Sequence, residues 1–383
     1  MKRIWILLLV LLLSACSLSE SSVDSGFELF MINVGKGDAI LAFVNEKTYL
    51  IDTGKAEMFG SVQAALIENG VQRIDGLFIT HTDKDHIGGV QLLLDAGFSV
   101  DRFYASGYTI EYEKEEKHPL VIAAKSQGKE VKWLYAGDEV DGVFEVLQPS
   151  VRLEDKENNN SLVMMLKTSA GNALLTGDME YPEENILFST GANLKCDVLK
   201  VPNHADNDTL SANLIAKAKP KIALISTSSY EKPETPDPAL VSRLETAGAE
   251  IYYTEFAEMG IRVSAAKDGI HAAYEKWKNA PALPTGLFIT RVDAKNDLIY
   301  ISSDQPIDLS GFQLYSDKGN EMMVFKKGTV IPKGETIIGT KTSDKNAYDI
   351  LWDDKNVIHN SKTDEIYLLD PYGRTVGMST NGY

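Results

Sequence analysis

Two histidines and two aspartates lie within the six residues from His81 to His86 of this chain. They directly follow the apolar run from Ile74 to Ile79, which predicts a buried strand. Neutral imidazole and carboxylate groups together suit Zn²⁺ or Mn²⁺, and a loop at the carboxyl end of a strand lets alternate side chains converge on one point. Because the chain has only six histidines, this density predicts a metal site rather than a surface turn.

The first residues have the pattern of a secretory signal. Two basic residues precede an apolar run from Ile4 to Leu13 that is too short to span a bilayer as a mature helix. The Leu-Ser-Ala-Cys sequence at 13–16 then resembles a bacterial lipobox, which predicts removal of residues 1–15 and lipidation of Cys16. We therefore expect an extracytoplasmic protein that is lipid-anchored to a bacterial membrane, with residues 16–26 as a polar tether. A plain secretory signal is the alternative.

Composition limits the partners of this chain. With 383 residues and 44% hydrophobic side chains, it has enough material for more than one globular domain. Its net charge of −17 repels polyanions. A nucleic-acid substrate would need a local basic strip or bound metal ions, and the sequence shows no cluster of Lys and Arg. If Cys16 carries lipid, Cys196 has no disulfide partner, and its apolar surroundings predict a buried, inert thiol.

Residues 27–278 alternate between strand and helix patterns. An antiparallel meander is expected from Phe27 to Val34, Asp38 to Val44 and Lys47 to Ile51, followed by a helix from Phe59 to Glu68. Further helices are expected after Asp85, Glu183, Thr209 and Pro238. Further strands are expected at Asp101 to Ala105, Glu130 to Tyr135, Val143 to Leu147, Ser161 to Lys167, Asn172 to Thr176, Asp197 to Val201, Ile222 to Ser226 and Glu250 to Thr254. This order predicts an α/β fold with sheets between helical layers, an αββα sandwich.

A different pattern follows a Pro- and Ala-rich linker at residues 279–286. Residues 287–383 contain only short strand patterns with turn signals between them. The strands are expected at Leu298 to Ile301, Gly311 to Tyr315, Met322 to Phe325, Thr336 to Ile338 and Ile366 to Leu369. This part of the chain predicts a separate, small all-β sandwich.

Polar residues stand at the ends of other predicted strands. Asp52 ends one strand, Asp178 follows another, and His204 comes shortly after a third. Asn158 to Ser161 form a polar cluster at the head of a fourth. Each of these alone would be explained as a turn or cap residue. Together with the segment from His81 to His86, they predict a site for two metal ions.

These motifs resemble the metallo-β-lactamase superfamily, and within it the ComEC-type competence-related hydrolase domain and bacterial phosphorylcholine esterases. The resemblance extends from Phe27 to about Lys276, and an aspartate at position 83 is specific for this branch. It is carried by Ile32 to Ala39, Ile51 to Gly54, His81 to Gly89, Asn159 to Val163, Thr176 to Asp178 and Leu199 to His204.

The resemblance implies two divalent metal ions, Zn or Mn, as cofactors. Their ligands are expected to be His81 and Asp83 for one ion, Asp85, His86 and His204 for the other, and Asp178 as a bridge. Asp52 would orient a ligating histidine. A hydroxide held between two cations is available near neutral pH, and both ions can stabilise charge on a phosphoryl oxygen. The histidine that many members have near Asn160 is absent, which leaves the first ion with three protein ligands.

Two positions depart from the family pattern. Related sequences carry two adjacent histidines where this chain has Asn203 and His204. Asn203 can donate or accept a hydrogen bond but cannot deliver a proton to a leaving group. Lys232 stands where relatives have a histidine; it would bind a substrate phosphate, or else is a solvated loop lysine.

The resemblance as a whole implies metal-dependent hydrolysis of phosphodiester bonds, by a nuclease or by a small phosphodiesterase. The catalytic positions would be Asp85, Asp178 and Asn203, and the substrate-binding positions Asn160, Ser161 and Lys232. DNA is one expected substrate, although the acidic charge opposes it. The alternative is a binding lipoprotein that keeps a metal site but is catalytically impaired through Asn203.

Two parts of the chain are expected to take no part in the chemistry. His118 follows the charged stretch from Glu111 to Lys117, which predicts a solvated helical face. Residues 287–383 resemble a lamin-tail domain of immunoglobulin-like fold through segments such as Asp308 to Leu314 and Tyr367 to Gly373. That resemblance implies an interaction or targeting role with a cell-surface partner. The oligomeric state stays open.

Overall fold

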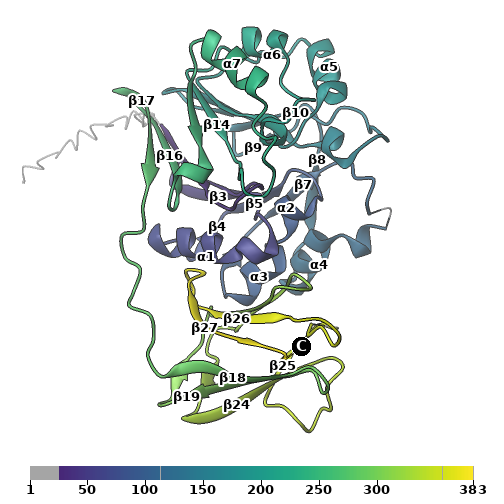
Figure 1. Ribbon diagram of the computed structural model, residues 1–383. Helices are drawn as coiled ribbons and strands as arrows, with labels where there is room; N and C mark the ends of the chain where they lie inside the picture. Colours follow the sequence, from purple (N-terminus) through teal and green to yellow (C-terminus); the bar gives the residue numbers. More distant parts are fainter. Residues whose placement is uncertain (1–25, 113, 356, 383) are drawn as a thin grey trace, which may run out of the picture.

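The computed structural model describes residues 26–112, 114–355 and 357–382, which form an α/β domain and an all-β domain (Figure 1). The expected signal at 1–15 and the lipidation site Cys16 lie outside the described residues. Within the described part of the chain, no helix combines the length and the apolar character needed to cross a membrane.

The first sheet of the α/β domain has eight strands and contains the N-terminal meander. In spatial order its strands are β17 (Gly269–Glu275), β16 (Gly260–Ala266), β1 (Phe27–Ile32), β2 (Ile40–Val44), β3 (Lys47–Ile51), β5 (Gly76–Ile79), β7 (Phe103–Ser106) and β8 (Val131–Leu134). Strands β1, β2 and β3 pair antiparallel, as predicted. From β3 to β8 the pairing is parallel, so the carboxyl ends of β3 and β5 lie at the same edge.

The second sheet has seven strands and changes from antiparallel to parallel pairing along its width. In spatial order its strands are β15 (Glu250–Tyr253), β14 (Ile222–Ile225), β13 (Val198–Lys200), β12 (Asn172–Leu175), β11 (Val163–Lys167), β10 (Phe144–Gln148) and β9 (Glu139–Val140). Cys196 precedes β13 and is buried, as predicted. Burial raises the pKa of its thiol to about 12, which leaves the thiol protonated and unreactive.

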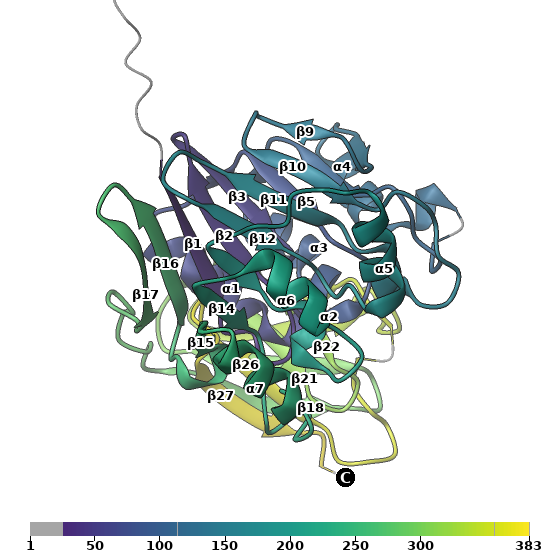
Figure 2. The ribbon, with the colours of Figure 1, turned by 90° about the horizontal axis from the view of Figure 1, so that it is seen from above.

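Helices cover the outer faces of both sheets, which gives the predicted αββα order of layers (Figures 1 and 2). On the first sheet lie α1 (Phe59–Glu68), α2 (Lys84–Ile87), α3 (Val90–Asp95) and α4 (Pro119–Ser126); on the second lie α5 (Tyr181–Ser189), α6 (Ala212–Ala218) and α7 (Pro238–Thr246). The inner faces of the sheets share one hydrophobic core, in which the Phe78 ring lies 5.1 Å from that of Phe144.

Strand β5 shows how the sequence selects this position. Leu77 and Ile79 pack into the core under the helices, while Phe78 between them packs into the core between the sheets. A strand covered on both faces requires a continuous apolar run. The first polar side chains therefore come after Ile79, where Thr80 and His81 lie at the carboxyl edge of the sheet.

The sequence reading missed β16 and β17, which extend the first sheet beyond β1. Strand β17 is an edge strand with mostly exposed or half-buried side chains, and β16 contains Gly260, Ala265 and Ala266, which favour strands weakly. The strands that were predicted are present, and their observed ends differ from the predicted ones by at most two residues, as is usual at element boundaries.

The C-terminal domain is all-β, as predicted. One four-stranded sheet contains β18 (Leu287–Asp293), β19 (Leu298–Ser303), β24 (Gly334–Thr340) and β25 (Ile350–Trp352); a second contains β22 (Glu321–Val324), β21 (Gln313–Ser316), β26 (Glu365–Leu369) and β27 (Thr375–Thr380); β20 (Ile307–Asp308) and β23 (Val330–Ile331) form a short pair. Ile301, Leu314 and Ile366 belong to one core shared by both larger sheets. The immunoglobulin-like topology and the lamin-tail relationship stay predictions.

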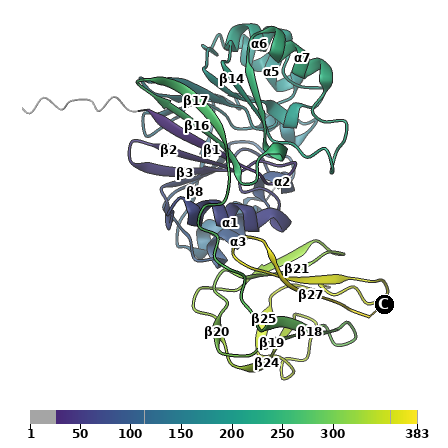
Figure 3. The same cartoon turned by 60° about the vertical axis from the view of Figure 1, so that its left-hand side comes forward.

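The all-β domain packs against the helical layer of the first sheet (Figure 3). Gln313 of β21 donates a hydrogen bond of 2.9 Å to Gln63 of α1, and both side chains are buried. The rings of Trp277 and Tyr372 meet edge to face at 5.7 Å. Residues 276–286, between β17 and β18, contain no helix or strand. This contact surface lies on the opposite side of α1 from the two sheets.

The prediction for His118 was wrong, because this side chain is buried rather than solvated. Its Nδ1 accepts a hydrogen bond of 3.2 Å from the backbone N–H of Leu120 and thereby caps α4, a helix that the sequence reading missed. The ring packs between Tyr112 and Trp133, at 5.3 Å from each ring centroid. A capping histidine is uncommon, and the charged residues before it concealed the start of the helix.

We expect His118 to make folding stability depend on pH. Burial lowers the pKa of His118 from 6.5 to about 4, so between these values the unfolded chain binds a proton that the folded chain does not. The stabilisation is present above pH 6.5 and is lost as the pH falls towards 4, for a total of about 3 kcal/mol. Urea unfolding across this range should show it as an excess pH dependence over His118→Asn, which keeps a capping side chain without a titrating group. Parallel stability curves for the two proteins would contradict this expectation.

Candidate metal centre

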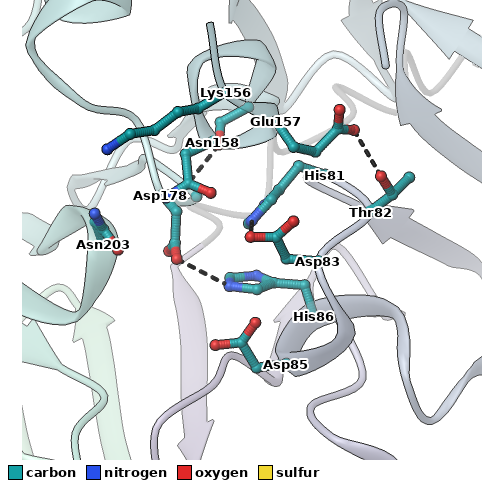
Figure 4. A network of polar contacts seen from close by, with 12 residues as sticks. His81, Thr82, Asp83, Asp85, His86, Lys156, Glu157, Asn158, Asp178 and Asn203 are labelled. Carbon is teal, nitrogen blue, oxygen red and sulfur yellow. Dashed lines mark hydrogen bonds and ion pairs between the residues drawn. The ribbon is translucent and has the colours of Figure 1, made fainter. Parts of the chain in front are cut away.

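Three histidines lie around one carboxylate at the carboxyl edge of the sheets, and Figure 4 shows two of them, His81 and His86, beside Asp178. His81 follows β5, His86 lies in α2, His204 lies in the short 3₁₀ helix η4 (Pro202–Ala205), and Asp178 follows β12. Asp178 Oδ2 lies 3.2 Å from His86 Nε2 and 3.0 Å from His204 Nε2. The ring centroids of His81 and His86 are 4.0 Å apart. Residues separated by more than a hundred positions thus meet at one point.

Two further aspartates flank the three rings. Asp83 Oδ2 lies 3.6 Å from His81 Nε2, and Asp85 Oδ2 lies 3.5 Å from His204 Nε2. The structure therefore gathers all six side chains that the sequence suggested as ligands. Five of them form two groups by proximity, His81 with His86 and Asp178, and Asp85 with His86 and His204, so that His86 is common to both. Asp83 lies beside the first group, at His81.

The Nε2 atoms of the three histidines are buried and make no contact with hydrogen-bond geometry. Burial by itself lowers the pKa of His86, but the charges of Asp178 and Asp52 outweigh burial and raise that pKa well above 6.5. Asp178 shows the converse: burial opposes its charge, yet His204, His86 and Lys200 hold its pKa well below the usual value. The carboxylates thus favour positive charge at His86, and imidazole with carboxylate donors fits divalent ions such as Zn²⁺ or Mn²⁺.

Buried hydrogen bonds orient each ring through its other nitrogen. His86 Nδ1 lies 2.8 Å from Asp52 Oδ2. His81 Nδ1 lies 3.1 Å from Thr80 Oγ1, which donates to the same oxygen of Asp52 at 2.7 Å. His204 Nδ1 lies 2.9 Å from Ser226 Oγ. With Nδ1 engaged as a donor, the lone pair of each Nε2 is left for a cation.

The backbone around two of these residues lies in the left-handed region. Asp52 has φ of 59°, and Asn203, His204 and Ala205 have φ of 45°, 53° and 63° in succession. Such a conformation costs about 1–2 kcal/mol for a residue with a side chain. At His204 it turns the chain sharply after Val201, so that the ring faces Asp178 and Ser226. Packing of the surrounding core holds this strain in place.

Two buried residues of the site escaped the sequence reading. Lys200, the last residue of β13, is buried and pairs with both Asp38 and Asp178. Asp38, buried after the turn at Gly37, accepts a hydrogen bond of 2.5 Å from Ser226 Oγ. The sequence offered one signal for Lys200, a single lysine inside an apolar strand pattern. A lysine is almost never buried unless it is paired, so such a lysine indicates a buried partner.

Asn203 faces carboxylates rather than the histidines. Its Nδ2 donates to Asp208 Oδ1 at 3.1 Å and to Glu180 Oε1 at 3.4 Å. Glu180 is buried and also accepts from Lys156 at 2.9 Å and from Asn158 at 3.1 Å. Asn203 therefore belongs to a polar group beside Asp178 that contains two carboxylates, Glu180 and Asp208.

The two residues expected to bind substrate at the head of β11 stabilise the scaffold. The Asn160 amide exchanges hydrogen bonds with the backbone of Leu153, donating at 2.8 Å and accepting at 2.9 Å. Ser161 Oγ accepts the backbone N–H of Asp178 at 3.0 Å. Asn160 thus fixes its own loop, and Ser161 fixes the loop that carries Asp178.

Lysines from distant parts of the chain surround the metal centre, although the sequence showed no basic cluster. Lys36 Nζ lies 3.4 Å from Asp85 Oδ2, and Lys156 contacts Glu180 and Asp208. Lys232 pairs with Asp206, and Lys55 pairs with Glu231. We call Lys36, Lys55, Lys156 and Lys232 the lysine rim. Each of its members is partnered by a carboxylate, which makes the rim nearly neutral.

Parts of this chain are similar in sequence to known proteins. The chain is 28% identical over 267 residues to ComE operon protein 3 of Bacillus subtilis (strain 168), which covers 64% of this chain and 33% of that protein. It is 27% identical over 255 residues to Recombination protein 2 of Haemophilus influenzae, covering 65% of this chain and 30% of that protein. The chain thus spans about a third of the length of these relatives.

Among solved structures, a metallo hydrolase named Igni18 from Ignicoccus hospitalis KIN4/I aligns with a TM-score of 0.39 and 14% identity, covering 63% of this chain and 99% of that one. The family model described as the metallo-beta-lactamase superfamily matches residues 32–229, which include every histidine and aspartate of the metal centre. The chain belongs to the metallo-β-lactamase superfamily.

Proposed function

We propose that this protein is a metal-dependent hydrolase of phosphodiester bonds. The observation that carries the proposal is the convergence of three buried Nε2 atoms on Asp178, with Asp83 and Asp85 beside them. Two divalent ions bound there, Zn²⁺ or Mn²⁺, would lower the pKa of a bound water and stabilise charge on a phosphoryl oxygen. The side chains of the site hold these charges in a fixed arrangement before substrate arrives.

Each ion would have its own ligands. His81 and Asp83 would hold one ion, and Asp85 and His204 the other. Asp178 would serve both, and His86, which is common to both groups, would complete the second. Asp52 would fix the Nδ1 proton of His86, and through Thr80 that of His81.

The lysine rim supports an anionic substrate. Lys36 contacts Asp85, and Lys156 contacts Glu180. A phosphodiester carries one charge and fits a nearly neutral rim better than a phosphate monoester or a long polyanion would. DNA is a candidate because one relative bears the name Recombination protein 2. A small diester is the candidate that the net charge of −17 favours.

Asn203 bears on whether the protein hydrolyses its substrate or only binds it. An alkoxide leaving group, as in DNA, needs a proton that Asn203 cannot supply, whereas p-nitrophenolate leaves without one. The protein would therefore cleave an activated diester whether or not another group protonates natural leaving groups. A protein that binds metal and cleaves neither substrate would be the catalytically impaired binding lipoprotein considered from sequence.

The location and partners of the protein belong to the same proposal. Lipidation at Cys16 would anchor it to a bacterial membrane on the extracytoplasmic side. Residues 287–383, the all-β domain, would then contact a cell-surface partner. This location gives the hydrolase access to substrates outside the cytoplasm.

We expect the Mn²⁺- or Zn²⁺-loaded protein to hydrolyse bis-p-nitrophenyl phosphate. Asp178→Ala should lower the rate by at least about 100-fold, because losing a shared ligand is more severe than losing a hydrogen-bond partner of a ligand. Asp268→Ala, at an exposed aspartate, should leave the rate unchanged. Release of p-nitrophenolate and cleavage of single-stranded DNA are measured side by side. Equal rates for the wild type and Asp178→Ala would refute the hydrolase and leave the binding role.

We also expect Asp52→Ala to weaken metal binding about 10- to 100-fold, because the His86 and His81 rings lose the acceptor that orients them. Calorimetric titration of the metal-free protein with Mn²⁺ measures this change, again with Asp268→Ala as the control. Removing the metal with a chelator should lower the unfolding temperature of the wild type, since ligand binding to the folded state alone stabilises it. Unchanged affinity in Asp52→Ala would exclude this aspartate from the metal centre.

A further inference from the structure

Lys200 is a buried cation directly behind the proposed metal site. The side chain is 1% exposed. It extends from β13 and lies between the two sheets. Its Nζ donates to the backbone carbonyl of Gly177 at 2.8 Å and to Asp178 Oδ1 at 3.1 Å, and it also pairs with Asp38. The three N–H groups of one ammonium thus have three acceptors. A lysine with all its donors engaged has a single fixed position.

This contact divides the two oxygens of Asp178 between different partners. Oδ1 receives the Lys200 ammonium, while Oδ2 faces His86 Nε2 and His204 Nε2. The backbone N–H of Asp178 donates to Ser161 Oγ, which fixes the main chain here, while the contacts of both oxygens restrain the carboxylate itself. Only one oxygen of Asp178 is left to face the space between the histidines.

The other partner of Lys200 extends the connection to a second ligand. Asp38 Oδ1 accepts from Ser226 Oγ at 2.5 Å, and the same hydroxyl lies 2.9 Å from His204 Nδ1. Lys200 therefore links Asp178 to His204 through Asp38 and Ser226, behind the metal-facing atoms. All of these side chains are buried.

The ammonium also fills a position that would otherwise attract a cation. Oxygens of Asp38 and Asp52 and a nitrogen of His86 lie close enough together to hold a metal ion. Lys200 pairs with Asp38 at this place, and Asp52 is occupied by His86 and Thr80. A third ion is therefore excluded by a charge that belongs to the chain itself.

We propose that Lys200 is a positioning residue that holds Asp178 so that one oxygen alone serves both metal ions. This inference rests on the proposed function, in which Asp178 is shared by the ions. The competing explanation is structural: Lys200 would only neutralise Asp38, and any apolar replacement of the pair would do as well.

The test compares Lys200→Met, Asp38→Asn, the double variant Lys200→Met/Asp38→Asn, and the control Lys221→Met, which removes an exposed lysine paired with Asp197. Asp38→Asn alone measures how much the altered contact with Ser226 affects His204. The double variant removes both buried charges and so keeps the test valid if Lys200→Met alone unfolds. Bound Mn²⁺ is titrated calorimetrically, and the electron paramagnetic resonance spectrum reports whether two ions are exchange-coupled through a bridge.

We expect the wild type and Lys221→Met to bind two Mn²⁺ with a coupled spectrum. In the double variant, Oδ1 of Asp178 is released and can close onto one ion, so the coupled spectrum should be lost and the second ion should bind about 10- to 100-fold more weakly than in Asp38→Asn. A double variant with the same spectrum and affinity as Asp38→Asn would overturn the inference and leave only charge neutralisation.

A wild type that binds no Mn²⁺ or Zn²⁺ would refute the proposed function but not the Lys200–Asp178 contact. In that case the contact is tested by urea unfolding of Lys200→Met, Asp178→Asn and their combination. Shifts of the midpoint that are not additive would support the pairing, since contacting residues couple. Additive shifts would overturn it.

Discussion

The two buried carboxylates behind the histidines, Asp52 and Asp38, are the groups on which the metal centre depends. Asp52 binds His86 directly and His81 through Thr80, while Asp38 reaches His204 through Ser226. A buried carboxylate without partners is strongly unfavourable, so the imidazoles and Lys200 stabilise these aspartates as much as the aspartates orient them. Orientation of the ligands and burial of charge are therefore one requirement.

The αββα architecture meets this requirement because parallel strands end at a common edge. Strands β3 and β5 deliver Asp52 and His81 from the first sheet, and β13 and β14 deliver Lys200 and Ser226 from the second. The core between the sheets stops at this edge, where polar side chains replace Phe78 and its neighbours. The first sheet supplies Asp52 with the histidine that it orients, His86. The second sheet supplies Asp178 and His204, so the site is complete only where the two sheets meet.

The sequence predicted the parts of this site that are local. The segment from His81 to His86 has its ligands within one turn of chain after an apolar strand, and the helix from Phe59 to Glu68 has clear periodicity and is present with those bounds. Lys200 and Asp38 could not be predicted in the same way, because a lysine in a strand is expected to reach solvent until its distant partner is known. The prediction for His118 failed for a related reason, because only the packing of Tyr112 and Trp133 against it reveals that it is buried.

The lysine rim shows that the net charge of a chain is a poor guide to the charges around one site. The net charge of −17 describes a field that repels polyanions at long range, yet the lysine rim comes from four separate segments and lies next to the metal centre. Because each lysine already contacts a carboxylate, an entering phosphodiester would have to displace Asp85, Glu180, Glu231 or Asp206 from its partner. The binding energy gained is therefore a difference between two ion pairs. With metal ions bound, such a site would gain most from the ions and least from the rim, which would favour a substrate whose charge is concentrated at one phosphoryl group.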